Sequence, residues 1–563
     1  MQESERIRVG ILSLIVVIVV SQIALFAQGT REIPDAVFYN GKVITVDGLN
    51  SIREAFAVKG DKFLAVGTSR EMRALAGPRT ELVDLKGKAV MPGMMDNHNH
   101  AYHAAMANRG IDLKDVTSLA ALLEGVRKAA AAAGPGKAVY VASGWQLNKF
   151  PEKHPPMRQD IDKVAPNNPV VIYVNRGQIY LNSPALKIAG VTRNTNRIGR
   201  VVIRKDDQGE PDGSITGESG TVARIADMIS PATHAEKEKL LIETQKQQLA
   251  VGLTSVRDLQ LAPDFMRTYY EMWRAGKMLQ RISAGLQVNP SDMETLEEML
   301  KPFGVGVGFG DNWLRLDCLA EFNPGSIWRS GNPAPAPNIE AAIYKNAILV
   351  ANRYGWRVSP HTDSDGAMDL VLDAFEAADK ESSIRDKRWT IEHATYVQLD
   401  QMDRIKKLGL VISAQAQLYR GAANAVRTLG KERAERAVPI REFLDRGIMV
   451  TGGSDWGGNS DSNNPFANIY FYVTRRSIDG NVIGAAQKIT RAEALRVETI
   501  NNAYLTFEEK IKGSIEAGKL ADFVILSQDI MSVPEEQIRA ITPLATYVGG
   551  KLLYDARTTI PKN

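Results

Sequence analysis

Two histidines separated by a single residue, His98 and His100, are the first side chains of this sequence whose spacing points to chemistry. They follow an apolar run at residues 89–91 that is typical of a buried strand. Side chains at positions i and i+2 of a strand point to the same face, so both imidazoles are expected to reach one metal ion from the end of that strand. Taken alone, the pair is better explained as two solvent-exposed histidines.

Three further polar side chains stand at the ends of apolar, strand-like stretches: His361, His393 and Asp455. His361 and His393 are 32 residues apart, and His393 and Asp455 are 62 residues apart. These intervals match one and two βα units of a (β/α)₈ barrel, which averages about 31 residues a unit. If His98 and His100 end the first strand, the other three residues follow the fifth, sixth and eighth strands. Catalytic groups of such barrels lie at the carboxyl ends of the strands.

Each of these residues, taken singly, is also explained as a hydrogen-bonded core histidine or a helix-capping aspartate. Their shared position at strand ends, with barrel spacing, favours a metal site instead. The sequence has one cysteine, Cys318, so a transition metal must be held by imidazole and carboxylate groups. The 69 basic and 65 acidic residues leave a net charge of +4, which gives no reason to expect nucleic acid as a partner.

The middle of the chain alternates helical and short apolar segments, the pattern of an α/β fold. We predict helices at residues 118–133, 235–250, 339–354, 367–378 and 490–501. We predict buried strands at residues 170–174, 254–256, 314–319, 357–361, 389–393, 411–414 and 449–451. Residues 144–232 are rich in Pro, Gly and Asn, show few periodic segments, and are expected to form a long insertion over one mouth of the barrel.

Short strand-like segments fill residues 34–91 and recur near the other end, at 513–526 and in a hairpin predicted for 545–548 and 551–554. We therefore expect residues 34–91 and 510–563 to form one small composite β-sandwich. A TIM barrel of residues 92–509 would be inserted between its two parts. The 563 residues are enough for a large barrel with such a satellite domain.

The N-terminus differs in composition from the rest of the chain. Arg6 and Arg8 precede an uncharged apolar run at residues 9–27, and small or polar residues follow. This pattern predicts an export signal in residues 1–28, with cleavage after Ala27 and a periplasmic or secreted protein as the result. The alternative is an uncleaved anchor formed by residues 9–27, which would be the chain's only association with a membrane.

These motifs resemble the amidohydrolase superfamily, most closely its family 3 branch of YtcJ-like and N-substituted formamide deformylase-like proteins. Residues 91–100 resemble the PGxxDxHxH strand of that branch, and residues 182–190 its NSxAL…AG segment. Residues 355–376 are similar to its GW-V--H…LDAFE block, and residues 388–393 to its R--IEH motif. Residues 453–455 match GSD, and residues 513–526 resemble the return strand GSIE-GK-ADFVIL. The resemblance covers nearly the whole chain after residue 28.

The resemblance implies a distorted TIM barrel with a flanking β-sandwich and a catalytic metal, usually zinc. The implied metal ligands are His98, His100, His361, His393 and Asp455. Asp455 would also take a proton from a metal-activated water and pass it to the leaving nitrogen. The expected reaction is hydrolysis of an amide-like carbon–nitrogen bond, other than a peptide bond, in a small-molecule substrate.

Two positions depart from the family pattern. Many relatives carry a lysine after the fourth strand that becomes carboxylated and bridges two metal ions, but Ala320 aligns with it here. Glu321 is adjacent and is a candidate ligand, although strand alternation points it to the opposite face unless a bulge intervenes. We therefore expect one Zn²⁺ ion rather than two. The second departure is Gln178, where relatives have a histidine.

Two alternative functions stay open at this stage. The same barrel and metal would also suit hydrolysis of another bond, such as a cyclic amidine, an ester or a phosphoester. The missing lysine also fits a binding protein that has lost turnover, although the presence of Asp455 argues against it. The sequence identifies neither the substrate nor the oligomeric state.

Overall fold

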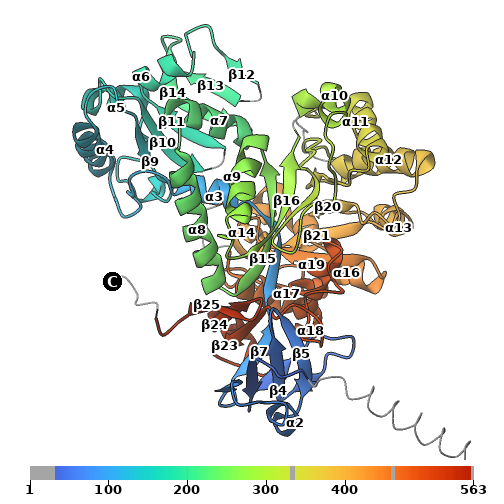
Figure 1. Ribbon diagram of the computed structural model, residues 1–563. Coiled ribbons are helices and arrows are strands. Elements are labelled where there is room, and N and C mark those ends of the chain that lie inside the picture. The colour runs from blue at the N-terminus through green and yellow to red at the C-terminus, as the bar shows by residue number, and fades with distance from the viewer. Residues whose placement is uncertain are drawn as a thin grey trace, which may run out of the picture.

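The computed structural model describes residues 32–558, apart from residues 176, 200, 289, 330–336 and 458–462. Figure 1 shows a β-domain at the bottom that combines both ends of the described chain, a barrel in the middle, and a separate sheet with its own helices at the upper left. Residues 1–28, which the sequence assigns to an export signal, lie outside the described residues. Within the described ranges, no helix is both long and apolar enough to cross a membrane.

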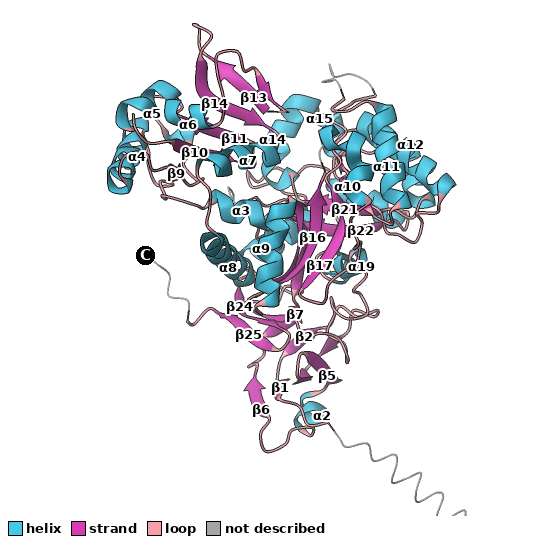
Figure 2. Ribbon diagram, turned by 45° about the horizontal axis from the view of Figure 1, so that its top comes forward, coloured by secondary structure: helices cyan, strands magenta, loops and turns pink. Residues whose placement is uncertain are grey.

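The barrel strands run parallel and occur around the barrel in chain order, as the central strands of Figure 2 illustrate. They are β8 (Met94–Asn99), β15 (Leu253–Leu261), β16 (Arg281–Gln287), β17 (Leu314–Ala320), β18 (Val358–Ser359) with β19 (His361–Thr362), β20 (Thr390–His393), β21 (Val411–Gln415) and β22 (Met449–Gly453). The fifth position is split at Pro360, which has no N–H to donate to a ladder. As a result β18 pairs with β17, whereas β19 pairs with β20.

The barrel closes where the chain leaving β22 meets β8. The N–H of Asp455 donates to the carbonyl of His98 (2.8 Å), and the N–H of His100 donates to the carbonyl of Trp456 (2.9 Å). The prediction of a distorted TIM barrel is confirmed. His98, His361, His393 and Asp455 lie at the first, fifth, sixth and eighth strand positions, as their spacing indicated.

Helices on the outside of the barrel cover its strands. They are α3 (Ala101–Ala107), α8 (His234–Ala250), α9 (Pro263–Arg274), α10 (Leu296–Leu300), α11 (Ala341–Arg353), α12 (Asp365–Glu381), α13 (Leu399–Lys407), α14 (Leu418–Leu429), α15 (Lys431–Glu435), α16 (Ile440–Asp445), α17 (Pro465–Thr474), α18 (Arg491–Val497) and α19 (Ile500–Leu505). The single helix predicted at 490–501 is therefore two helices. Thr499 separates them, with φ −135° and ψ −94°, and its hydroxyl donates to the carbonyl of Leu495 (2.6 Å).

Residues 139–217 contain far more regular structure than their composition suggested. They form the sheet β12-β13-β14-β11-β10-β9, which Figure 1 shows beside the barrel mouth. Its strands are β9 (Val139–Val141), β10 (Val170–Asn175), β11 (Gln178–Leu181), β12 (Arg197–Ile198), β13 (Val201–Lys205) and β14 (Pro211–Gly217). The helices that accompany the sheet are α4 (Leu119–Ala133) before it, α5 (Arg158–Val164) and α6 (Ser183–Ile188) between its strands, and α7 (Ser219–Ile229) after it. The strand predicted at 170–174 is present, but it belongs to this sheet and not to the barrel. An apolar run predicts that a strand is buried, but it does not predict which sheet the strand joins.

The two ends of the described chain share the lower β-domain. One sheet has the order β5-β4-β1-β6, and the other has the order β25-β24-β23-β7-β2-β3, so C-terminal strands pair directly with N-terminal ones. The strands are β1 (Ala36–Tyr39), β2 (Lys42–Ile44), β3 (Ile52–Arg53), β4 (Ala55–Lys59), β5 (Lys62–Gly67), β6 (Glu81–Asp84), β7 (Ala89–Pro92), β23 (Phe523–Leu526), β24 (Pro543–Val548) and β25 (Lys551–Asp555), with α2 (Ser69–Arg73) at one edge. Phe523 packs within 5.0 Å of the rings of Phe38 and Phe56. This shared core fixes β7, which leads straight into β8 and the histidine pair.

Candidate metal centre and active site

β8 delivers the first histidine pair to the carboxyl-terminal mouth of the barrel. The rings of His98 and His100 are buried, and their centroids lie 5.1 Å apart. The carboxylate of Asp96 accepts the backbone N–H of Ser454 (2.9 Å) and the amide of Asn99 (2.7 Å). These bonds fasten the end of the first strand to the eighth, so both imidazoles are held on one side of the mouth.

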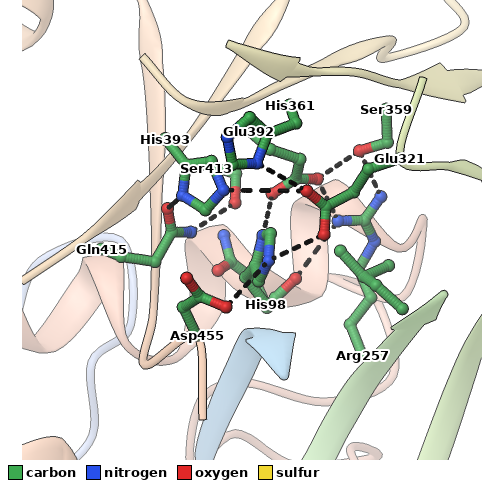
Figure 3. A network of polar contacts seen from close by, with 12 residues as sticks. His98, Arg257, Glu321, Ser359, His361, Glu392, His393, Ser413, Gln415 and Asp455 are labelled. Atoms are coloured by element: carbon green, nitrogen blue, oxygen red, sulfur yellow. Dashed lines mark hydrogen bonds and ion pairs between the residues drawn. The ribbon is translucent and has the colours of Figure 1, made fainter. Parts of the chain in front are cut away.

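His361 and His393 complete a compact set of four imidazoles. Their ring centroids are 4.3 Å apart, and the ring of His393 lies 4.6 Å from that of His98. His393 is a non-glycine residue with a φ of 69°. Such backbone conformations concentrate at functional sites, where the surrounding structure imposes them. The chain turns there and directs the ring into the mouth (Figure 3).

Glu321 points into the same space, contrary to the simple alternation rule. The pairing of β16 with β17 shifts register between Ala284 and Gly285, so β17 carries an extra residue opposite this point, and β17 itself ends at Ala320. A bulge is therefore present in β17, and Glu321 itself lies one residue beyond the end of the strand, where the alternation rule no longer applies. One oxygen of Glu321, Oε1, lies 3.3 Å from His98 Nε2 and 3.6 Å from His100 Nε2. The other, Oε2, lies 2.8 Å from His361 Nδ1 and 3.8 Å from His393 Nε2.

Asp455 lies on the other side of the histidine pair from Glu321. Its Oδ1 is 3.1 Å from His100 Nε2 and 3.5 Å from His98 Nε2. The residue adopts a left-handed φ of 55°, and its side chain keeps 23% of its surface exposed. It therefore combines contact with the imidazoles and access to solvent, both of which a proton-transferring carboxylate needs.

Each ring presents one nitrogen to the centre, because the other nitrogen is held from behind. His98 Nδ1 donates to Glu392 Oε2 (2.7 Å), and His100 Nδ1 donates to the carbonyl of Leu259 (3.2 Å). The corresponding acceptor for His361 Nε2 is Asp363 Oδ2 (2.8 Å), whereas His393 Nδ1 lies between Gln415 Oε1 (2.8 Å) and Gln417 Nε2 (2.9 Å). A carboxylate or a backbone carbonyl only accepts, so in His98, His100 and His361 it takes the N–H and leaves the opposite nitrogen as a lone-pair donor, as in metal-ligating histidines.

The donor set fits a divalent transition metal. His98 Nε2 is buried and makes no hydrogen bond within the described residues, so its lone pair needs another partner. Single donor atoms of His98, Glu321 and His393 lie within 4.8 Å of one another, and the same holds for His98, His100 and Asp455. Neutral imidazoles together with carboxylates are the ligands that zinc and similar metals take in proteins.

The buried carboxylates and imidazoles of the centre favour a bound cation. Burial opposes protonation of His98, but the carboxylates of Glu321 and Glu392 outweigh it and raise the pKa of His98 to about 10. Burial also opposes ionisation of Glu321, but the neighbouring histidines hold its pKa well below the usual range. The protein therefore concentrates negative charge around the imidazoles, and this charge stabilises either protons or a metal ion.

Comparison with known proteins identifies the architecture. A sequence model of the amidohydrolase family matches residues 81–554, which include all the site residues described above. The chain belongs to the amidohydrolase family. It is accordingly a metal-dependent hydrolase that acts on carbon–nitrogen bonds other than peptide bonds.

Relatives of this amidohydrolase match it along nearly their whole length. An N-substituted formamide deformylase of Arthrobacter pascens is 29% identical, over 93% of this chain and 99% of that protein. The putative amidohydrolase YtcJ of Bacillus subtilis is 24% identical, over 92% and 99%. Among solved structures, an uncharacterized metal-dependent hydrolase of Pyrococcus furiosus superposes with a TM-score of 0.70 at 24% identity, over 88% of this chain and all of that one. An atrazine chlorohydrolase of Arthrobacter aurescens, complexed with zinc, has a TM-score of 0.51 at 16% identity, over 94% and 97%.

A buried ionic network below the amidohydrolase site was not found from the sequence. Glu392 Oε1 accepts from Arg257 Nη1 (2.5 Å), and Arg257 Nε donates to Asp317 Oδ2 (2.5 Å). Arg357 donates to the other oxygen of Asp317, and Ser359 donates to Glu392 (Figure 3 shows the Glu392 end). Burial favours the neutral form of Glu392, but Arg257 and His98 hold its pKa below the usual range. Glu392 is thus an ionised carboxylate that orients His98.

The separate sheet contributes the outer wall of the site. A cavity of about 400 Å³ lies over the histidines, and Asn175, Gly177 and Gly217 from β10, β14 and their connections reach it. Gln178, which replaces the family histidine, instead donates its amide to the hydroxyl of Tyr180 (3.1 Å) and is absent from the described lining. The insertion predicted from the sequence therefore borders the site, through residues that the sequence did not single out.

Proposed function

We propose that this amidohydrolase hydrolyses an amide-like bond of a small molecule with a zinc-type centre held by His98, His100, His361, His393, Asp455 and Glu321. The observation that carries the proposal is the buried Nε2 of His98, which makes no hydrogen bond in the described residues and lies 3.3 Å and 3.5 Å from the carboxylates of Glu321 and Asp455, while Glu392 fixes its tautomer. The nature of the relatives supports the choice of bond, since one of them is an N-substituted formamide deformylase.

Asp455 is the residue that moves the proton in this proposal. A divalent cation bound here would polarise the scissile carbonyl and lower the pKa of a water molecule to about 7. Asp455 faces the same imidazoles and retains solvent access, so its carboxylate can accept the water's proton. Once protonated, it can donate that proton to the departing nitrogen, which would otherwise leave as an unstable amide anion.

Removal and return of metal tests the proposed function. The purified protein should hydrolyse simple formamides and N-acyl amines, with release of the amine measured directly. Dialysis against a chelator should abolish this activity while circular dichroism shows an intact fold, and added Zn²⁺ should restore it. Unchanged turnover after complete removal of metal, measured by elemental analysis, would contradict the proposal.

The position of Glu321 favours two ions over the single ion that the sequence predicted. Its Oε1 faces His98 and His100, whereas its Oε2 faces His361 and His393, so one carboxylate serves both pairs. We expect about two zinc ions per chain in the native protein and about one after Glu321→Ala, because imidazole pairs alone bind zinc less tightly than a set with a carboxylate. The measurement is elemental analysis after gel filtration, with Glu381→Ala, in an exposed ion pair on α12, as the control. One ion per chain in all three proteins would restore the single-ion centre.

Export is a separate proposal that rests on composition alone. The apolar run at residues 9–27, preceded by Arg6 and Arg8, supports secretion to the periplasm or the medium. N-terminal sequencing of the protein from fractionated cells tests it. A mature N-terminus near Gln28 in the soluble exported fraction is expected, whereas an intact N-terminus in the membrane fraction would indicate the anchor.

A further inference from the structure

The wall of the cavity above the metal centre consists of polar side chains and two glycines. Besides the histidines and the carboxylates of Glu321 and Asp455, the described lining consists of Asn175, Gly177, Gly217, Ser219, Gln260 and Asn323. Among these lining residues none has an aliphatic side chain, a lysine or an arginine. Pockets for small molecules are usually lined mainly by apolar groups, so this composition carries information about the substrate.

The two asparagines of this wall have a defined orientation. Asn175 Oδ1 accepts the backbone N–H of Gly177 (2.9 Å), and Asn323 Oδ1 accepts the backbone N–H of Gly325 (2.8 Å). The assignment of oxygen and nitrogen in an amide is often ambiguous, but a backbone N–H can only donate, so the oxygen must face it. In the described residues, neither Nδ2 group makes a hydrogen bond of its own.

Gln260 adds a third amide from a different element, with a hydroxyl instead of a backbone N–H as its partner. It lies at the end of β15 with a φ of 61°, and its Oε1 accepts the hydroxyl of Ser219 (3.1 Å). Its Nε2 has no hydrogen-bond partner within the described part of the chain. Three amide groups thus have their oxygens occupied by the protein and their N–H donors available at the cavity.

We propose that the substrate carries acceptor oxygens, of the carbonyl or carboxylate type, in addition to its scissile carbonyl. The inference rests on the proposed amide hydrolysis and specifies its substrate class. Acceptor oxygens satisfy the donors of Asn175, Gln260 and Asn323, whereas an alkyl or aryl substituent buries them without partners. An unmade hydrogen bond of this kind weakens binding by about two- to tenfold for each donor. The neutral donors also explain how such a substrate is bound without a cationic side chain in the described lining.

Three formamides of similar size test the substrate class: N-formylglycinamide, N-formylglycine and N-propylformamide. We expect the first two to be hydrolysed with at least tenfold higher kcat/KM than the third. Their relative rates separate a neutral carbonyl from a carboxylate as the preferred acceptor. Binding to the metal-loaded Asp455→Asn protein, measured by calorimetry, should follow the same order without any need for turnover.

Isosteric variants test whether the substrate preference comes from the amide donors of the two asparagines. Asn175→Asp and Asn323→Asp keep the oxygen that accepts the Gly177 or Gly325 N–H, but they replace the amide donor with a second acceptor. Each variant should lower the affinity for N-formylglycinamide about fivefold, because one hydrogen bond is lost. The affinity for N-formylglycine should fall further, because the new carboxylate repels the carboxylate of this substrate. The affinity for N-propylformamide should not change. Asn424→Asp, at an exposed position of α14, is the matched control.

The outcomes distinguish this inference from the proposed function. Equal affinities for the three compounds, or Asp variants that leave the order unchanged, would overturn the inference even if all three are hydrolysed. Selective binding without hydrolysis of any of them would support the inference and contradict the proposed amide hydrolysis.

Discussion

Replacing Asp455 by asparagine is expected to lower kcat by about 10³-fold, because positioned proton transfer contributes about 10²- to 10⁴-fold to catalysis. Asparagine keeps an oxygen near His98 and His100 and also tolerates the left-handed backbone that Asp455 adopts, with φ 55°. The fold and most of the bound metal should therefore survive, and the loss should appear in kcat rather than in KM.

The measurement is steady-state kinetics alongside elemental analysis of the same samples. Asp479→Asn, at an exposed position after α17, controls for the loss of one carboxylate. A variant at Asp455 that holds its metal and turns over at the native rate would assign the proton transfer to another group. A variant that loses metal and activity together would mean that Asp455 acts mainly as a ligand.

The sequence located best those site residues that are marked by their immediate neighbours in the chain. His98, His361, His393 and Asp455 each follow a short apolar run, and a run that ends in a polar group marks a strand end whatever it pairs with. The barrel spacing then ordered them correctly. Nothing beyond the neighbouring residues and the chain interval was needed for these assignments.

The parts that the sequence missed depend on partners far away in the chain. β16 contains Arg281 and is buried throughout its first six residues, which contradicts the expectation that buried strands are apolar. Arg281 is accommodated because its guanidinium makes two bonds with the carboxylate of Asp522, at 2.7 and 2.9 Å. The direction of Glu321 likewise departs from strand alternation, because β17 ends at Ala320, one residue before it. Sequence periodicity does not carry such information.

Glu392 shows the same limit at the site itself. It lies in the motif that supplied His393, yet its significance comes from Arg257, 135 residues away, and from His98, 294 residues away. Side chains alternate along a strand, so Glu392 and His393 leave β20 in different directions. His393 faces the candidate metal centre directly, whereas Glu392 reaches the interior of the barrel and orients His98 from behind (Figure 3).

Replacing Glu392 by glutamine is therefore expected to have the largest effect on stability. Glu392 is fully buried between Arg257 and His98, and glutamine removes the charge while leaving the buried guanidinium. Breaking one side of a buried ion pair costs about 3–5 kcal/mol of unfolding free energy, and losing the group that orients a ligating histidine weakens metal binding about 10- to 100-fold. Urea unfolding of the metal-free protein and zinc calorimetry measure the two effects separately.

Two further variants show whether the effect comes from the uncompensated charge. Glu381→Gln disrupts an exposed ion pair with Arg353 and should leave the urea midpoint unchanged. The double variant Glu392→Gln with Arg257→Met removes both charges and should be more stable than the sum of the single losses. If Glu392→Gln alone left both the unfolding midpoint and the zinc affinity at native values, Glu392 would not be the residue that orients His98. If the double variant were additive, the cost would come from lost packing rather than from an uncompensated positive charge beside Asp317, because two groups that share one ion pair cannot contribute independently.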